Sequence, residues 1–157
     1  MAQPMNDYSV TLTDGRAVWF ASQARRIVVK LGSSTVSDGR GQVRAELLWP
    51  LCESLHAIME GPPRRRAVLV SSGAIAMGWP RLGLKRRPST MPDKQAAAAV
   101  GQGLLMAYYE QQFMRLGRPA AQVLLTSDDL RDRKRFNHAR RTMEALLARG
   151  AVPVVNE

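Results

Sequence analysis

A lysine and a glycine–serine pair stand together at the end of the chain's first regular apolar run. Lys30 is followed by Leu31, Gly32, Ser33 and Ser34. A lysine at the end of a strand can present its ammonium group to a phosphoryl group, and a glycine lets backbone N–H groups approach phosphate oxygens. The segment fits phosphate chemistry, although a lysine in this position is more often a surface residue whose stem covers apolar neighbours.

A second turn of small residues, Ser71-Ser72-Gly73-Ala74, follows another apolar run and opens a short helical stretch. The backbone N–H groups at the start of a helix attract anions, so this turn could hold a carboxylate as well as a phosphate. The alternative is structural, with a serine as the N-cap and the glycine permitting close packing. The turn by itself does not separate these two interpretations.

Other phosphate and metal motifs are absent. No segment matches the G-x-x-x-x-G-K-[ST] loop, and Gly101-Gln102-Gly103 lacks the third small residue of a dinucleotide fingerprint and falls inside a helical pattern. Cys52 and His56 are four residues apart, but two ligands do not make a zinc site. We therefore expect no metal site built from protein ligands alone.

The elements that must position these turns alternate between strands and helices. The predicted strands cover residues 26–31, 67–70, 119–125 and 151–155, and the longer helices cover 43–60, about 93–116 and a stretch around 139–147. This alternation predicts an α/β fold, a three-layer α-β-α sandwich with a mainly parallel sheet. Pro50 either kinks the first long helix or belongs to its first turn. The next long helix begins with alanines and glycines, which permit close packing.

In a parallel sheet the ligand site lies outside the carboxyl ends of the strands. This rule selects the segments that follow the four predicted strands: Gly32-Ser33-Ser34, Ser71-Ser72-Gly73, Thr126-Ser127 and Asn156-Glu157. We expect the chemistry at these positions.

Composition limits the class of protein. The 157 residues suit one domain, and no apolar run approaches the roughly 18 residues of a membrane helix. The first eight residues lack an apolar signal core, so we expect a cytoplasmic protein with no membrane contact. The net charge of +10 could indicate nucleic acid binding. However, the basic stretch 131–141 is interleaved and preceded by aspartates, which favours a solvated helix face and makes nucleic acid an unlikely partner.

Taken together, the motifs resemble the amino-acid kinase family, and within it the glutamate 5-kinases. Five segments carry the resemblance in the family's order: 26–34, 70–78, 94–102, 124–139 (Leu124-Leu125-Thr126 and Asp132 to Ala139) and 152–157. The resemblance runs from about Arg26 to the last residue and covers the amino-terminal portion of those enzymes only. It implies the amino-acid kinase fold for residues 26–157.

The resemblance also implies an activity and roles for particular residues. Glutamate 5-kinases use ATP with Mg²⁺ to phosphorylate the γ-carboxylate of L-glutamate, the first step of proline biosynthesis, and the complete enzymes are expected to be homo-oligomers. The residues that match their sites fall into two groups. Lys30, as the catalytic lysine, Gly32 and Ser33 are expected at the ATP phosphates, and Ser72, Gly73, Ala74 and Asn156 are expected at glutamate.

The sequence also departs from the family. Residues 1–25 match nothing in it, and Asp14-Gly15 between β-forming residues allows either a hairpin or a disordered leader. The family continues past Asn156-Glu157 to an aspartate at glutamate and to the nucleotide-binding part. We therefore expect a truncated kinase domain that is inactive alone, with an unpaired edge or an uncovered face on its sheet. The alternatives are a non-catalytic remnant that binds glutamate or a full-length kinase, and a basic nucleic-acid-binding module.

Overall fold

The structure, a computed structural model, describes residues 23–156. The expected hairpin or disordered leader over residues 1–25 lies almost entirely outside this range. In chain order the elements are β1 (Arg26–Leu31), α2 (Ser33–Val36), α3 (Ala45–Glu60), β2 (Arg66–Ser71), α4 (Ala74–Gly78), the 3₁₀ helix η1 (Trp79–Leu82), α5 (Met91–Arg115), β3 (Ala120–Val123), α6 (Ser127–Arg131), α7 (Arg133–Ala148) and β4 (Val152–Asn156). None of the helices in this range is long and apolar enough to span a membrane.

The four strands form one sheet in the order β1-β2-β4-β3, and every neighbouring pair is parallel. Arg26 is the Cα partner of Arg66 at the amino end, and Leu31 is the partner of Ser71 at the carboxyl end. Ser71 also pairs with Asn156 of β4. The predicted parallel sheet is confirmed, and its register brings the carboxyl ends of β1, β2 and β4 together.

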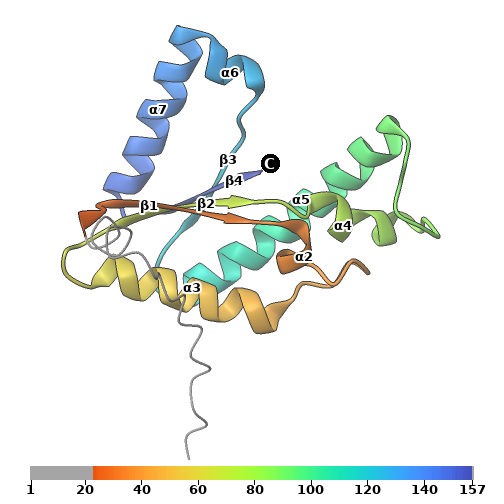
Figure 1. The fold of residues 1–157 in the computed structure, drawn as a ribbon, viewed down its shortest axis with the longest axis horizontal. Helices are drawn as coiled ribbons and strands as arrows, with labels where there is room; N and C mark the ends of the chain where they lie inside the picture. Colours follow the sequence, from red (N-terminus) through yellow and green to blue (C-terminus); the bar gives the residue numbers. More distant parts are fainter. Residues whose placement is uncertain (1–22, 157) are drawn as a thin grey trace, which may run out of the picture.

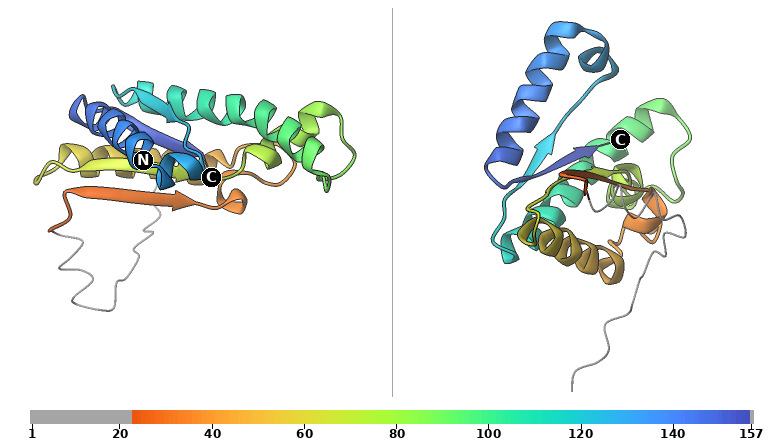
Figure 2. Two further views of the ribbon diagram at one scale, coloured as in Figure 1. Left: turned by 90° about the horizontal axis from the view of Figure 1, so that it is seen from above. Right: turned by 60° about the vertical axis from the view of Figure 1, so that its left-hand side comes forward.

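Helices α3 and α5 cover one face of the sheet, and α7 lies over the other (Figures 1 and 2). This arrangement confirms the predicted α/β sandwich. Alternate strand residues face the α3 and α5 layer because side chains on a strand point to opposite faces in turn. The core contains, among others, Leu31, Ala67, Leu69, Val152 and Val154 from the strands, with Leu48, Leu55, Tyr109 and Phe113 from the helices.

The residues that the structure describes cover the opposite face of the sheet only in part. The Val28 side chain of β1 lies on it and is 66% exposed, while α7 packs on the β4 side of the sheet (Figure 1). The expectation of an unpaired edge or an uncovered face in a truncated domain stays a prediction. The last strand, β4, has neighbours on both sides in the described chain, because β2 and β3 flank it.

Pro50 lies inside α3, because the helix begins at Ala45. The interpretation that placed Pro50 in the first turn is therefore wrong. Ser54 Oγ donates a hydrogen bond to the Pro50 carbonyl at 2.8 Å. The buried face of α3 consists of Leu48, Cys52, Leu55 and Met59.

Candidate functional site

A cavity of about 260 Å³ opens at the carboxyl ends of the strands. Ser33 from α2, the turn Ser72-Gly73-Ala74 after β2 and Asn156 at the end of β4 all line it. These are five of the seven site residues that the sequence predicted. They come together because the parallel register aligns the ends of β1, β2 and β4.

Gly73 shapes this cavity by its backbone. Its φ of 113° lies in the left-handed region, which residues with a side chain rarely adopt. A Cβ atom at Gly73 would also lie 2.9 Å from Val36 Cγ1, so α2 packs directly on the turn. The Ser72 N–H donates to the Leu31 carbonyl at 2.9 Å, which joins the ends of β2 and β1. The two small-residue turns of the sequence therefore form one structural unit.

Helix α4 is held behind the turn by direct backbone contact with α5. A Cβ atom on Gly101 would lie 1.8 Å from the Ala74 carbonyl oxygen, and one on Gly78 would lie 1.9 Å from the Ala97 oxygen. Only glycine fits at such a separation. The small-residue half of α5 thus packs closely, as its composition predicted, and it fixes Ala74 at the cavity wall.

The side chains of the adjacent serines Ser71 and Ser72 have different surroundings. Ser71 is fully buried, and its Oγ lies 2.9 Å from the Tyr109 hydroxyl, with which it shares a hydrogen bond. Burial raises the pKa of Tyr109 to about 12, while the hydrogen bond to Ser71 opposes that rise. Ser71 therefore anchors the strand end in the core, whereas Ser72 faces the cavity.

Asn156 brings an unsatisfied acceptor to the site. Its Oδ1 atom is buried and has no hydrogen-bond partner in the described chain. A buried carbonyl oxygen without a partner is unfavourable by about 1–3 kcal/mol. A ligand that donates a hydrogen bond here would relieve this cost, and an ammonium group is such a donor.

Arg87 is the charged residue among those lining the cavity, and the sequence did not identify it. It comes from the loop between η1 and α5, which the motifs do not cover. A guanidinium group binds a carboxylate in a bidentate manner, so the cavity combines an anion-binding side chain with the Asn156 acceptor. A cavity residue on a loop has no periodic pattern, and only the three-dimensional contact reveals it.

Lys30 and Gly32 lie beside this cavity rather than in its lining. Lys30 is exposed near the end of β1, and the alternation along the strand places it on the face opposite Leu31. Gly32 has an extended backbone and is exposed, and a Cβ atom on it would meet no atom within 4 Å. Their expected role at the ATP phosphates stays a prediction. The described residues contain no group of three His, Cys, Asp or Glu side chains that could hold a metal ion.

Thr126 follows its strand but does not line the cavity, contrary to the strand-end rule. It caps α6: Asp129 N–H donates to Thr126 Oγ1 at 3.2 Å, and Thr126 N–H donates to Asp129 Oδ2 at 2.8 Å. The hydrogen bonds from the Thr126 side chain and backbone lower the pKa of Asp129. Strand β3 lies at the edge of the sheet, next to β4 and away from β1.

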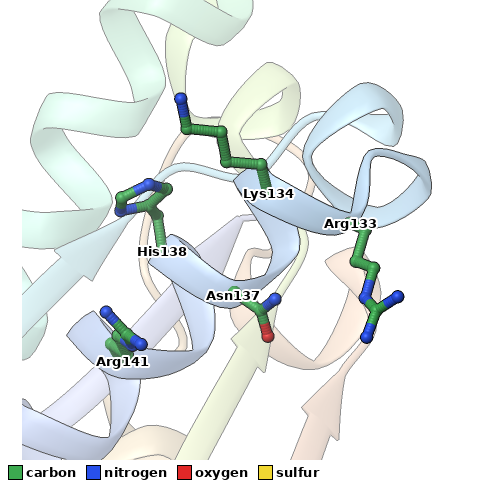
Figure 3. A pocket seen from close by; sticks show the side chains of 5 residues that line it. All are labelled: Arg133, Lys134, Asn137, His138 and Arg141. Carbon is green, nitrogen blue, oxygen red and sulfur yellow. The ribbon is translucent and has the colours of Figure 1, made fainter.

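A larger surface concavity, of about 410 Å³, lies along α7 (Figure 3). Arg133, Asn137 and Arg141 occupy successive turns, with Lys134 and His138 on the neighbouring side of the same helix. The basic side chains among them are exposed. All five residues come from one helix, which agrees with the predicted solvated helix face rather than with an enclosed ligand site.

Comparison with known proteins gives the class of the chain. Residues 25–157 match the amino acid kinase family. The match covers most of the chain and begins where the regular pattern of strands and helices begins. The chain therefore belongs to the amino acid kinase family.

Individual relatives show which members of this family the chain is similar to. The chain is 50% identical over 136 residues to the glutamate 5-kinase of Moorella thermoacetica, covering 87% of this chain and 35% of that protein. It is 52% identical over 132 residues to the glutamate 5-kinase of Gloeobacter violaceus, covering 83% of this chain and 35% of that protein. It is 49% identical over 134 residues to the glutamate 5-kinase of Thermus thermophilus, covering 85% of this chain and 35% of that protein. The chain thus spans about 35% of the length of these relatives.

Proposed function

We propose that this chain supplies the glutamate-binding turn and the phosphate-binding loop of a glutamate 5-kinase. The reaction is the ATP-dependent phosphorylation of the γ-carboxylate of L-glutamate to L-glutamyl 5-phosphate, the first step of proline biosynthesis. The observation that carries the proposal is that Ser33, Ser72 and Asn156, from three separate segments, line one cavity. Two relatives that are 50% and 52% identical to this chain over the aligned residues are named glutamate 5-kinase.

Each polar group of glutamate has a complementary residue in the cavity. Asn156 Oδ1 is a buried acceptor without a partner and suits the α-ammonium group. Arg87 suits the α-carboxylate. The Ser72 hydroxyl donates to a carboxylate oxygen and orients the side chain toward Ser33 and Gly32. This arrangement directs the γ-carboxylate to the phosphate-binding loop.

The chain's own residues then act by positioning and by charge. The γ-carboxylate is ionised at neutral pH and is already a nucleophile, so no general base is required. ATP, when bound, supplies the phosphoryl group, with Mg²⁺ offsetting its charge. Lys30 neutralises negative charge on the phosphate oxygens, and the backbone around Gly32 and Ser33 holds them. We assign the catalytic role to Lys30 and the binding roles to the other six predicted residues.

The aligned part of this chain covers only 35% of each of these relatives. We infer that the 157 residues alone bind glutamate but form no measurable glutamyl phosphate. The reason is that some of the groups that offset charge on the transferred phosphoryl group are expected in the rest of the relatives' sequence. The complete enzyme is proposed to act in the cytoplasm as a homo-oligomer. Steady turnover by the pure chain with ATP and glutamate would contradict the inference of inactivity.

Calorimetric titration tests the assignment of the cavity. We expect saturable binding of L-glutamate, with L-aspartate and N-acetyl-L-glutamate at least about tenfold weaker, because each leaves a buried group without its partner. Ser72→Ala and Asn156→Ala should each weaken glutamate binding about fivefold to a hundredfold. Ser89→Ala, at an exposed position outside the cavity, is the matched control and should leave binding unchanged. Equal binding of aspartate, or equal effects of all three substitutions, would refute the assignment.

A further inference from the structure

A second cavity, also of about 260 Å³, lies at the amino end of the sheet. Arg64 and Arg65 from the loop before β2, Arg66 at its start, and Arg118 from the loop before β3 line it. We call these four residues the arginine cup. Its wall also includes the buried side chains of Met59 and Leu147. Nothing in the proposed kinase chemistry uses this cavity.

Arg118 is fixed in place within the cup. Its Nε donates to His56 Nδ1 at 3.1 Å, and its guanidinium donates to the Gly150 carbonyl at 3.0 Å. It also forms an ion pair with Glu60. The Arg118 side chain is only 13% exposed. A guanidinium held in this way loses little freedom when an anion binds next to it.

The cup has an excess of positive charge. The C-termini of α3 and α7 lie at the cavity, and each carries about half a negative charge, which favours arginine there for purely structural reasons. Glu60 adds one more negative charge. Together these groups of the described chain supply about two negative charges, against the three guanidinium groups of Arg64, Arg66 and Arg118 with Arg65 left out of the count. Arg64 and Arg66 form no ion pair in the described part of the chain.

The register of the sheet adds a fifth arginine beside the cup. Arg26 of β1 is the Cα partner of Arg66 of β2. Both lie on the face of the sheet opposite the α3 and α5 core, since Ala67 points into that core. Like charges directly opposite each other on neighbouring strands are destabilising. An anion between them would remove this repulsion.

We propose that the arginine cup binds a compact oligophosphate anion, such as pyrophosphate or tripolyphosphate. One guanidinium group can bind two phosphate oxygens at once, and several guanidinium groups line this one small cavity. The cup and the candidate glutamate cavity lie at opposite ends of β2, about 17 Å apart along six residues at roughly 3.3 Å per residue. The two sites are therefore distinct, and this inference does not depend on the proposed kinase function.

Calorimetry at constant ionic strength tests the cup with defined probes. Tripolyphosphate should bind the 157-residue chain in a saturable manner, and sulfate at least about tenfold more weakly, because it carries fewer charges. The double variant Arg64→Ala/Arg66→Ala should weaken tripolyphosphate binding at least about tenfold. The control Arg133→Ala/Lys134→Ala removes the same charge from α7 and should change binding less than twofold. Equal losses in the two double variants would mean diffuse attraction and overturn the proposal.

Nuclear magnetic resonance locates the site without relying on a variant. Tripolyphosphate should shift the backbone amide signals of Ala148 and Gly150 at the cup. Shifts confined to Gly73 and Ala74, which line the same cavity as Ser33 of the proposed ATP phosphate loop, would overturn the proposal. A short single-stranded RNA tests whether the cup also binds the phosphate groups of a polymer. Tripolyphosphate should displace this RNA from the cup. RNA binding that tripolyphosphate does not displace and that requires Arg133 and Lys134 would overturn the proposal in favour of a surface along α7.

Discussion

The backbones of Gly78 and Gly101 are in direct contact: a Cβ atom on Gly101 would stand 2.7 Å from the Gly78 nitrogen. This contact joins α4, which follows the turn after β2, to the alanine-rich half of α5. Helix α4 begins at Ala74, whose carbonyl oxygen would lie closer still, 1.8 Å from the same Cβ atom on Gly101. The position of the candidate glutamate turn thus depends on a glycine almost thirty residues away in the sequence.

Substitution of Gly101 by alanine should disrupt this contact. The new Cβ would overlap the Ala74 oxygen at 1.8 Å, and α4 and α5 would have to move apart. We expect Gly101→Ala to lower the free energy of unfolding by about 3 kcal/mol or more, since overpacking against backbone cannot relax through a rotamer change. Urea denaturation followed by circular dichroism measures the effect.

Gly103→Ala is the matched control in the same helix. Gly103 is exposed, and a Cβ atom there meets nothing within 4 Å. Alanine should stabilise α5 at this position by about 0.5–1 kcal/mol, because glycine has the lower helix propensity. Similar effects of the two substitutions would show that the close contact between α4 and α5 is not present in solution.

The Ser71–Tyr109 pair gives a prediction at alkaline pH. Burial holds the pKa of Tyr109 at about 12, above its usual value of 10.0, so folding favours the neutral phenol. This contribution to stability is complete below pH 10 and is lost as the pH rises toward 12. At pH 7, Tyr109→Phe should be less stable than wild type by about 1 kcal/mol, through loss of the hydrogen bond to Ser71.

The difference between wild type and Tyr109→Phe should therefore shrink between pH 10 and pH 12, because only the wild type has this group to ionise. Denaturation at pH 7, 10 and 11 measures the trend. A stability difference that stays constant or grows over this range would contradict the burial of the Tyr109 hydroxyl.

Cys52 should be unreactive in the folded chain. Its side chain is fully buried, and burial, followed by the nearby Glu53 charge, raises the pKa of its thiol to about 12. Because the thiolate is the reactive form, a disulfide reagent at pH 8 should label Cys52 only after unfolding. The labelling rate in native buffer should fall at least about a hundredfold below the rate in denaturant. Rapid labelling in native buffer would show that α3 does not pack on the sheet as described.

Much of this fold follows from local pattern. The apolar runs at 26–31 and 67–70 predicted strands that form with nearly the same bounds, and their parallel pairing follows from the helix between them. The predicted strand at 119–125 was too long, because β3 ends at Val123. The short helices α2 and α6 were missed, since four or five residues do not establish a period.

The candidate site was predictable where motifs mark it and not elsewhere. Ser33, Ser72 and Asn156 follow strands, and the strand-end rule brings them together. Arg87 lies on a loop without a pattern. The Arg118–His56 hydrogen bond joins residues 62 positions apart, and the Ser71–Tyr109 bond joins residues 38 positions apart. Contacts of this kind depend on how α3 and α5 pack on the sheet, which no local window of sequence contains.

The last prediction concerns Gly73, which joins the fold to the candidate site. Alanine at this position would adopt φ near 113° only with strain, and its Cβ would meet Val36 Cγ1 at 2.9 Å. Both effects push α2 away from the turn after β2. We therefore expect Gly73→Ala to destabilise the chain by about 2 kcal/mol or more and to weaken L-glutamate binding at least about tenfold.

Gly39→Ala separates backbone strain from loss of the contact. Gly39 also has a positive φ, 79°, but a Cβ atom there meets nothing within 4 Å. Its substitution should cost about 1 kcal/mol of backbone strain and leave glutamate binding unchanged. Calorimetric titration of both variants at a temperature where each is folded makes the comparison. If Gly73→Ala folds and binds glutamate as the wild type does, the turn after β2 is not the glutamate site. If Gly39→Ala also loses binding, the effect comes from general strain rather than from the contact between Gly73 and Val36.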